Sequence, residues 1–377
     1  MQEEIQDLTI IGGGIMGLFT AYYASEFVRN ITILEKSYIG DKNTASFFHT
    51  RSMRTDYIDP IYSRFAYEAR QLWLDLERTA PERFMISCGV LNLAKGNITS
   101  DFSKTHAEQS FQTLANLHFK KERFNRNDLR KRFPQFDADL GCLDVESGFF
   151  YIPVITQTLI EILRAKQINI IENIEVRQVE RHDDSLLIRT SRGEHLTQKL
   201  VMTAGHGSNE VLKRIKSCNI NFPLRPDRPR CKYFIPPAEK WNQFTSDKFP
   251  VFAYLDIGVY GHPIYEGKTP GVKISFYNPK SVKEDDIESF IADCIPSLQD
   301  ARVSLENIDK CFYDFTPDDD FILGNLPGQK DIYVGTGWNG TGYKFAPWVG
   351  KVLMQLALQE ETIYDIRRFS PQRFALA

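Results

Sequence analysis

The sequence has little net charge and no long uninterrupted apolar run. Its 377 residues carry a net charge of −3, which gives no electrostatic case for binding nucleic acid or an anionic membrane surface. The local basic run RPDRPRCK, residues 225–232, is broken by an aspartate and two prolines and is typical of a turn leading into a strand. The acidic start MQEEIQDL and the glycines that interrupt the next apolar stretch argue against an export signal or a membrane span.

Cysteine is also scarce, with six residues, no CxxC pair and no metal-ligand spacing. This pattern excludes a disulfide framework and favours a reducing compartment, so we expect a cytoplasmic protein without a metal site. No internal repeat or low-complexity segment is present. The composition, 42% hydrophobic and 25% charged, is that of a folded globular protein. The length of 377 residues exceeds what one simple core accommodates, so we expect two domains.

The stretch LTIIGGGIMGLFTAYYASEF carries the strongest local signal. The apolar run of residues 8–11 predicts a buried strand, and Gly12, Gly14 and Gly17 then form G-x-G-x-x-G before a helical pattern. The first glycine permits a tight turn, the second lets the backbone approach a pyrophosphate, and the third lets helix and strand pack closely. The N–H groups at the start of that helix would hold the phosphates.

A second strand, ITILEKS, places Glu35 close to the offset of about 20 residues at which an acidic side chain accepts hydrogen bonds from an adenosine ribose. Glu35 argues against NADP, but it does not distinguish NAD from FAD. The order strand, glycines, helix, strand and acidic residue predicts a dinucleotide site rather than a glycine turn without a ligand. The stretch GFFYIPVITQTLIEILRAKQ contains a pattern that predicts an amphipathic helix with Ile155, Leu159, Ile162 and Leu163 on one face. Strand patterns dominate residues 225–310.

Several spaced motifs in order resemble the monomeric sarcosine oxidase and N-methyltryptophan oxidase group of the D-amino-acid-oxidase-like FAD enzymes. They are IIGGGIMG, TRSMR with FAYEARQLWLDLE, CGVL, VESGFF, VMTAG, GVK, KCFYDFTPDDDFILG and GTGWNGTGYKFAPWVGKVLMQLA. The resemblance covers nearly the whole chain and implies FAD as the cofactor. It also implies an α/β (α+β) fold, with a Rossmann-like FAD-binding domain of residues 1–90, 148–225 and 310–377 and a mixed-sheet substrate domain of residues 91–147 and 226–309.

The resemblance places Cys311 where enzymes of this group bond covalently to the flavin ring. The alternative, a packed structural cysteine, is the ordinary behaviour of a free thiol. The further cofactor residues that the resemblance implies are Ile15, Met16, Lys36, Thr50, Arg51, Val176, Gly205, Gly340, Gly342 and Lys344.

Arg54 and Lys344 match the pair that holds the substrate carboxylate in this group, and a guanidinium can clamp a carboxylate with two hydrogen bonds. Lys273 matches the lysine that promotes oxygen reduction near the flavin, the alternative being an edge-strand lysine facing solvent. Tyr260 and Tyr313 match cavity tyrosines, and Arg51 lies near the ring. Three positions that are histidine in sarcosine oxidase are Phe47, Tyr277 and Thr341 here, so sarcosine is not the expected best substrate.

The sequence therefore predicts an FAD-dependent amine oxidase for a carboxylate-bearing secondary or N-methyl amino acid. Hydride leaves the carbon beside nitrogen for the flavin, the imine is hydrolysed, and O2 is reduced to H2O2. The alternatives are a dehydrogenase with another electron acceptor and a non-catalytic flavoprotein subunit. We expect a small amino or imino acid substrate, no nucleic acid or membrane partner, and a monomer or weak homo-oligomer.

Overall fold

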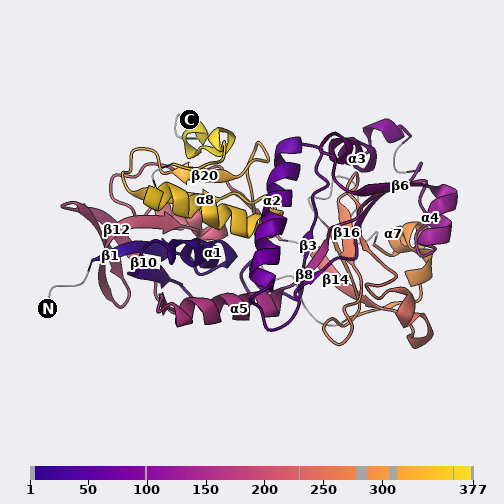
Figure 1. The fold of residues 1–377 in the computed structure, drawn as a ribbon, viewed down its shortest axis with the longest axis horizontal. Coiled ribbons are helices and arrows are strands. Elements are labelled where there is room, and N and C mark those ends of the chain that lie inside the picture. Colours follow the sequence, from indigo (N-terminus) through magenta and orange to yellow (C-terminus); the bar gives the residue numbers. More distant parts are fainter. Residues whose placement is uncertain are drawn as a thin grey trace.

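The computed structural model describes residues 5–97, 100–228, 230–276, 287–304, 312–359 and 361–374. Two of the predicted site positions, Cys311 and Tyr277, lie outside these ranges. The chain forms two lobes that meet at the long helix α2 (Pro60–Glu77), as Figure 1 shows. Within the described ranges, no helix combines the length and the apolar character needed to cross a bilayer.

The first lobe is built on an eight-stranded sheet that contains the predicted N-terminal strand. The central strand β1 pairs in parallel with β2 on one side and β12 on the other. A parallel strand covered on both faces reads as a continuous apolar run, which is why Leu8 and Ile10 are fully buried. In order, the strands are β10 (Val176–His182), β11 (Ser185–Thr190), β12 (Gly193–Met202), β1 (Gln6–Ile11), β2 (Ile31–Leu34) and β9 (Asn169–Ile171), with β21 (Ile332–Thr336) beside β12 and β20 (Ile322–Asn325) beside β21.

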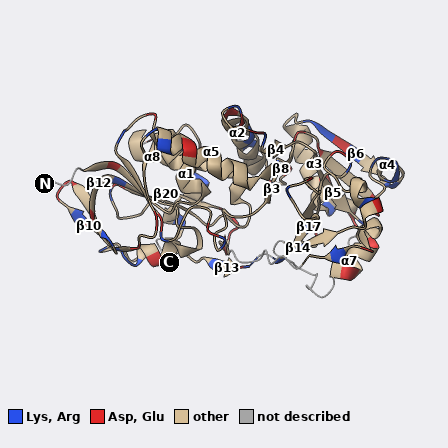
Figure 2. Ribbon diagram, turned by 90° about the horizontal axis from the view of Figure 1, so that it is seen from below, with Lys and Arg blue, Asp and Glu red and all other residues tan. Residues whose placement is uncertain are grey.

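Helix α1 (Ile15–Ala24) packs against α8 (Ala346–Gln359) and α5 (Ile152–Ala165), and Figure 2 shows the three helices together on one side of the sheet. A Cβ atom at Gly350 would lie 2.5 Å from Phe19 Cβ, so this glycine lets α8 approach α1 closely. The predicted apolar face of α5 is confirmed. Its residues Ile155, Leu159 and Leu163 are buried, while Ile162 is partly buried.

The second lobe is a mixed eight-stranded sheet with β17 in its interior. In order, its strands are β18 (Arg302–Val303), β14 (Arg230–Ile235), β17 (Val272–Phe276), β16 (Val259–His262), β15 (Val251–Tyr254), β5 (Val90–Ala94), β7 (Leu140–Asp144) and β6 (Lys121–Asn125). Its helices are α3 (His106–Asn116), α4 (Arg126–Arg132) and α7 (Ile287–Cys294). Lys273 on β17 is 3% exposed, so the alternative of an edge-strand lysine facing solvent is wrong.

A three-stranded sheet of β3 (Thr50–Met53), β8 (Gly148–Tyr151) and β4 (Met85–Ile86) lies between the two large sheets. A two-stranded pair joins β13 (Arg225–Asp227) to β19 (Tyr313–Phe315), and the short helix α6 (Ser208–Leu212) follows β12. The mixed α/β class predicted from the sequence is confirmed. The exact division at residues 90, 147, 225 and 309 stays a prediction.

Candidate active site

A cavity of about 790 Å³ joins the glycine loop after β1 to the wall formed by β15 and β16. Ligand sites in proteins commonly have this size. The sequence-predicted residues that line it are Gly12, Gly14, Ile15, Met16, Glu35, Lys36, Arg51, Arg54, Val176, Gly205, Tyr260, Tyr313, Gly340, Gly342 and Lys344. Gly17, Thr50 and Lys273 are described but do not line the cavity, and Cys311 lies outside the described residues. The structure therefore brings together residues from both ends and the middle of the chain.

The glycine loop has the geometry that the motif predicts. Gly12 has a φ of +109°, and a Cβ atom there would lie 2.6 Å from the backbone oxygen of Thr203. A Cβ atom at Gly17 would lie 2.0 Å from the Gly12 oxygen, so Gly17 acts in packing and not at the cavity wall. Gly14 precedes α1, whose first turn contains no acidic residue. The positive end of α1 is thus left to an anionic ligand.

Glu35 follows β2 directly and its carboxylate lies beside this loop. Its Oε2 accepts a hydrogen bond of 2.7 Å from the Gly13 N–H, and its Oε1 accepts one of 2.9 Å from the Ser37 N–H. Both oxygens keep capacity for a further donor, since a carboxylate can accept about four hydrogen bonds. Glu35 is therefore placed to accept from a ribose while it braces the loop.

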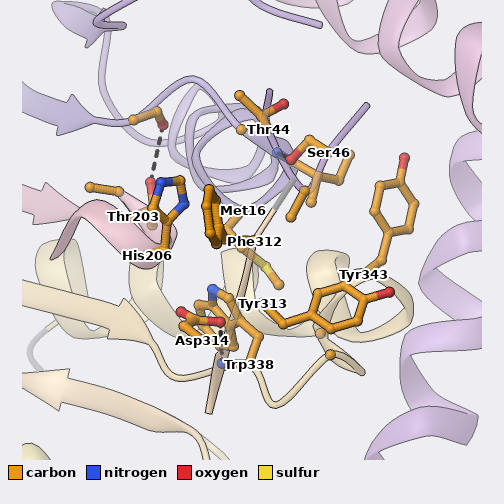
Figure 3. A pocket seen from close by; sticks show the side chains of 18 of the residues that line it. Met16, Thr44, Ser46, Thr203, His206, Phe312, Tyr313, Asp314, Trp338 and Tyr343 are labelled. Carbon is orange, nitrogen blue, oxygen red and sulfur yellow. Dashed lines mark hydrogen bonds between the residues drawn. The ribbon is translucent and has the colours of Figure 1, made fainter. Parts of the chain in front are cut away.

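Asp314 organises the far wall of the cavity, and the sequence analysis missed it. Its Oδ2 accepts from the Gly337 N–H at 2.9 Å and from the Thr336 hydroxyl at 3.0 Å. Its Oδ1 accepts from the Trp338 N–H at 3.0 Å (Figure 3). Burial raises the pKa of Asp314. The carboxylate fixes the loop that carries Gly340, and the acidic turn in FYDFTPDDD gave no means of choosing Asp314 over its neighbours.

Further cavity residues escaped the sequence analysis because they lie far apart in the chain. His206 and Phe312 contact each other with ring centroids 5.2 Å apart, and Figure 3 shows the two rings side by side. The Arg228 guanidinium lies 4.5 Å from the Phe312 centroid. Ser46 accepts a hydrogen bond of 2.9 Å from the Ile15 N–H at the start of α1. A single sequence carries no pattern that joins such positions.

Arg51 holds the loop that precedes β3. Its guanidinium donates to the backbone oxygens of Ala45 at 2.9 Å, Phe47 at 2.8 Å and Thr50 at 3.1 Å. Phe48 has a φ of +132°, a strained conformation for a residue other than glycine, and these hydrogen bonds stabilise the loop around it. Arg51 therefore lines the cavity and also fixes the backbone of the loop beside it.

Arg54 and Lys344 both line the cavity, and their role as a pair for a substrate carboxylate stays a prediction. The Arg54 guanidinium lies 4.1 Å from the centroid of the Tyr57 ring, and Lys344 Nζ lies 5.8 Å from the same centroid. Lys344 Nζ also donates to the Thr341 backbone oxygen at 2.9 Å. Burial and the Arg54 charge hold the pKa of Lys344 well below its ordinary value. An anionic group bound here would favour the charged ammonium.

Arg54 is also paired with an internal carboxylate. Its Nη1 lies 2.9 Å from Asp56 Oδ1, and Asn92 donates to the other oxygen of Asp56. Burial raises the pKa of Asp56 despite the Arg54 charge, and burial together with Asp56 raises the pKa of Asp144 to about 6. Asp144 accepts from the Thr55 N–H at 2.7 Å. These buried acids fix the segment that carries Arg54.

Lys273 lies behind the cavity wall. Its Nζ donates to the Thr50 backbone oxygen at 3.1 Å and lies 5.8 Å from the centroid of the Tyr260 ring. The Thr50 hydroxyl in turn lies 2.7 Å from Nδ1 of His262, a buried residue that the sequence analysis did not single out. Tyr260 connects this group to the cavity, which it lines.

Of the three positions that the resemblance marks as departures from sarcosine oxidase, two lie in the described residues. Thr341 lines the cavity and anchors Lys344 through its backbone oxygen. Phe47 is exposed and does not line the cavity, and Tyr277 lies outside the described residues. The wall formed by β15 instead presents Val251, Phe252 and Ala253.

The residues present fit FAD. The glycine loop and the N-terminus of α1 suit a pyrophosphate, and Glu35 suits a ribose. At the opposite end, a Cβ atom at Gly342 would lie 2.6 Å from Trp338 Cβ, so Gly342 lets the loop pack closely on Trp338. Both residues line the cavity. The glycine loop, the N-terminus of α1 and Glu35 thus offer the groups that the ADP part of FAD needs, and they line the same cavity as the later segment with Gly340 and Gly342.

The comparisons with known proteins agree with this geometry. A family profile described as FAD dependent oxidoreductase matches residues 7–356. Human peroxisomal sarcosine oxidase is 28% identical over 402 residues, covering 99% of this chain and 97% of the relative. N-methyl-L-tryptophan oxidase of Yersinia pestis (strain Pestoides F) is 28% identical over 392 residues, covering 98% of this chain and 99% of the relative. The predicted resemblance to these two groups is confirmed.

Solved structures show the same fold at lower identity. L-proline dehydrogenase from P. horikoshii superposes with a TM-score of 0.84 at 17% identity, covering 99% of both chains. NikD, an amino acid oxidase of nikkomycin biosynthesis, superposes with a TM-score of 0.77 at 19% identity, covering 98% of both chains. With its cavity, its glycine loop and a family match over nearly its whole length, this chain belongs to the FAD dependent oxidoreductase family.

Proposed function

We propose that this protein oxidises the C–N bond of a carboxylate-bearing secondary or N-methyl amino acid, with O2 as the electron acceptor. The observation that carries the proposal is the convergence of Arg54 and Lys344 on the Tyr57 ring at the cavity wall. Both 28%-identical relatives are named as oxidases of N-methylated amino acids, which supports this substrate class.

The two cations would bind the substrate carboxylate. Arg54 offers a planar set of donors, and its Nη1 donates to both the backbone oxygen and Oδ1 of Asp56 at 2.9 Å. Lys344 adds an ammonium near the same tyrosine ring. Tyr260 and Tyr313 line the cavity with them, together with the apolar residues of β15. This arrangement orients the substrate carbon next to nitrogen and excludes water from it.

When bound, FAD supplies the two-electron redox chemistry. The substrate loses two electrons and two protons as its C–N single bond becomes C=N, and O2 takes up both to give H2O2. Water then hydrolyses the imine to an amine and a carbonyl compound. The Lys273 ammonium behind the wall is the charge that would stabilise reduced oxygen, since it is buried and held by the Thr50 oxygen.

The test is a screen of N-methyl amino acids and cyclic imino acids for H2O2 release, combined with anaerobic bleaching of the flavin. We expect Lys273→Met to lower the oxygen-dependent rate on the order of 100-fold and to keep the rate with an artificial electron acceptor. Equal loss with both acceptors would contradict the role of Lys273. Turnover of the wild type only with the artificial acceptor would favour a dehydrogenase, and no bleaching by any of these compounds would reject the substrate class.

We further propose that Cys311 bonds covalently to the flavin, because its neighbour in the chain, Phe312, lines the cavity. The thiol S–H and a ring-substituent C–H would be replaced by an S–C bond, with two electrons and two protons passing to O2. Yellow colour kept in an acid-precipitated pellet, and lost from it in Cys311→Ala, is the expected result. Cytoplasmic location and a monomeric or weakly associated state also stay proposals, testable by cell fractionation and light scattering.

A further inference from the structure

His262 lies at the end of β16, outside the cavity wall, and both of its ring nitrogens have partners. Nδ1 lies 2.7 Å from the Thr50 hydroxyl and Nε2 lies 2.8 Å from the Ser52 hydroxyl. Side chains two residues apart on a strand point to the same face, so Thr50 and Ser52 present both hydroxyls to one ring. The imidazole is fully buried and stacks on Phe149 with ring centroids 5.8 Å apart. It thus ties β3 to the large sheet of the second lobe.

The ring is neutral in this setting. His262 pairs directly with Lys273 in the β16–β17 register, and burial with the Lys273, Arg51 and Lys344 charges holds the pKa of His262 well below its ordinary value. A neutral imidazole has one donor and one acceptor, so one of the two hydroxyls donates to it and the other accepts from it. The hydroxyl hydrogens of Thr50 and Ser52 are thereby oriented in opposite senses.

The two hydrogen-bonding partners of His262 contact different parts of the candidate site. Ser52 lines the cavity, so its hydroxyl orientation is part of the wall. Thr50 is held at its hydroxyl by His262 and at its backbone oxygen by Lys273 Nζ, 3.1 Å away. A shift of Thr50 would therefore move the contact that holds the ammonium.

We infer that His262 is a positioning residue that fixes Thr50 and Ser52 on β3 relative to Lys273 on β17. It contacts neither the cavity nor a substrate and acts through these neighbours. The Ser52 part of the inference stands on the cavity geometry alone, whereas the Lys273 part rests on the proposed function. A histidine that only fills the core would give the packing without the two-sided hydrogen bonding.

The test compares His262→Phe, His262→Asn and Phe149→Leu in the FAD-loaded enzyme. Phenylalanine keeps the ring and loses both hydrogen bonds, whereas asparagine can keep a polar group near the position of Nδ1 and so hold Thr50. Phe149→Leu is the matched control, because it removes the stacking partner and leaves both hydrogen bonds. Each variant is reduced with dithionite and mixed with O2, and its visible flavin spectrum and thermal unfolding are recorded.

We expect His262→Phe to shift the flavin absorption bands and to slow reoxidation by about tenfold or more, since small displacements of a positioned group cost rates of this order. His262→Asn should recover most of the reoxidation rate, and Phe149→Leu should lower the unfolding temperature without the spectral shift. An unchanged spectrum and rate in His262→Phe would overturn the inference, as would equal spectral shifts in His262→Phe and Phe149→Leu.

If His262→Phe does not fold, His262→Asn decides the matter. His262→Asn loses the contact with Ser52, so its flavin spectrum should shift in the same way as the spectrum of Ser52→Ala. This shared shift supports the inference, and its absence overturns it. If the wild type itself reoxidises no faster than free reduced flavin, the proposed oxidase function has failed. The spectrum of His262→Phe against that of Phe149→Leu then decides the positioning role on its own.

Discussion

The two ends of the cavity are built in different ways. The glycine-loop end uses backbone groups and one carboxylate from residues 12–35, which are close together in the sequence. The opposite end has charged side chains from β3, from Arg54 directly after it and from the segment before α8, while Lys273 of β17 lies behind the wall; several of these side chains are buried and held by buried partners. Ligand binding by backbone groups depends on the conformation of the main chain, whereas ligand binding by buried charges depends on the protein group that each charge is paired with. Single substitutions should therefore affect the two ends differently.

The largest effect is expected from Arg54→Met. Loss of a charged hydrogen-bonding partner typically costs about 2–5 kcal/mol in binding, which corresponds to a fall in kcat/KM on the order of 100-fold or more. The variant also leaves Asp56 buried without its cation, so the free energy of unfolding should fall by about 3–5 kcal/mol. Steady-state kinetics and denaturant unfolding measure the two effects.

A double variant separates these effects. Arg54→Met with Asp56→Asn removes both charges, and it should recover most of the stability without recovering activity. Recovery of activity in the double variant would show that Arg54 serves only to neutralise Asp56.

At the other end of the cavity, Gly12→Ala should weaken FAD binding by about tenfold or more, because its Cβ atom would meet the Thr203 oxygen at 2.6 Å. Gly40→Ala is the matched control. Gly40 has a φ of +84° and no atom within 4 Å of where a Cβ would stand, so it carries the conformational cost of about 1 kcal/mol without the clash. Fluorescence titration of each apoprotein with FAD measures the two affinities. Equal FAD affinities of Gly12→Ala and Gly40→Ala would show that backbone strain, and not the clash with Thr203, weakens binding.

The last prediction concerns the pH dependence of stability and not ligand binding. A carboxyl group whose pKa is higher in the folded protein than in the unfolded chain binds protons more tightly when folded. The stabilising contribution of Asp144 is therefore complete below about pH 4 and is lost as the pH rises through about 6. Asp144→Asn should remove this loss of stability. The slope of the free energy of unfolding against pH should therefore become smaller, by up to about 1.4 kcal/mol per pH unit between about pH 4 and 7. The exposed Asp184→Asn should leave the slope unchanged, and an unchanged slope in Asp144→Asn would contradict the assignment.

The same contrast explains how much the sequence could predict. The glycine loop, Glu35 and the buried strand β1 follow from local spacing, because residues within one strand–helix–strand unit determine each other's positions. Arg54, Lys344 and Lys273 were proposed through motif resemblance, and local patterns alone would have left them as ordinary charges. Asp56, Asp314 and His262 escaped detection because their roles depend on partners more than about 20 residues away, such as Asn92, Gly337 and Thr50.

The first lobe closes only when the two ends of the chain meet. Strand β21 pairs with β12, and α8 packs on α1, so the N-terminal glycine loop is completed by elements near the C-terminus. Gly340, Gly342 and Lys344 belong to this late segment and line the same cavity as Gly12. Because domains generally fold as units, the complete cavity can form only after nearly the entire polypeptide has been synthesised. The complete site for FAD therefore requires β21 and α8, which are among the last elements to be synthesised.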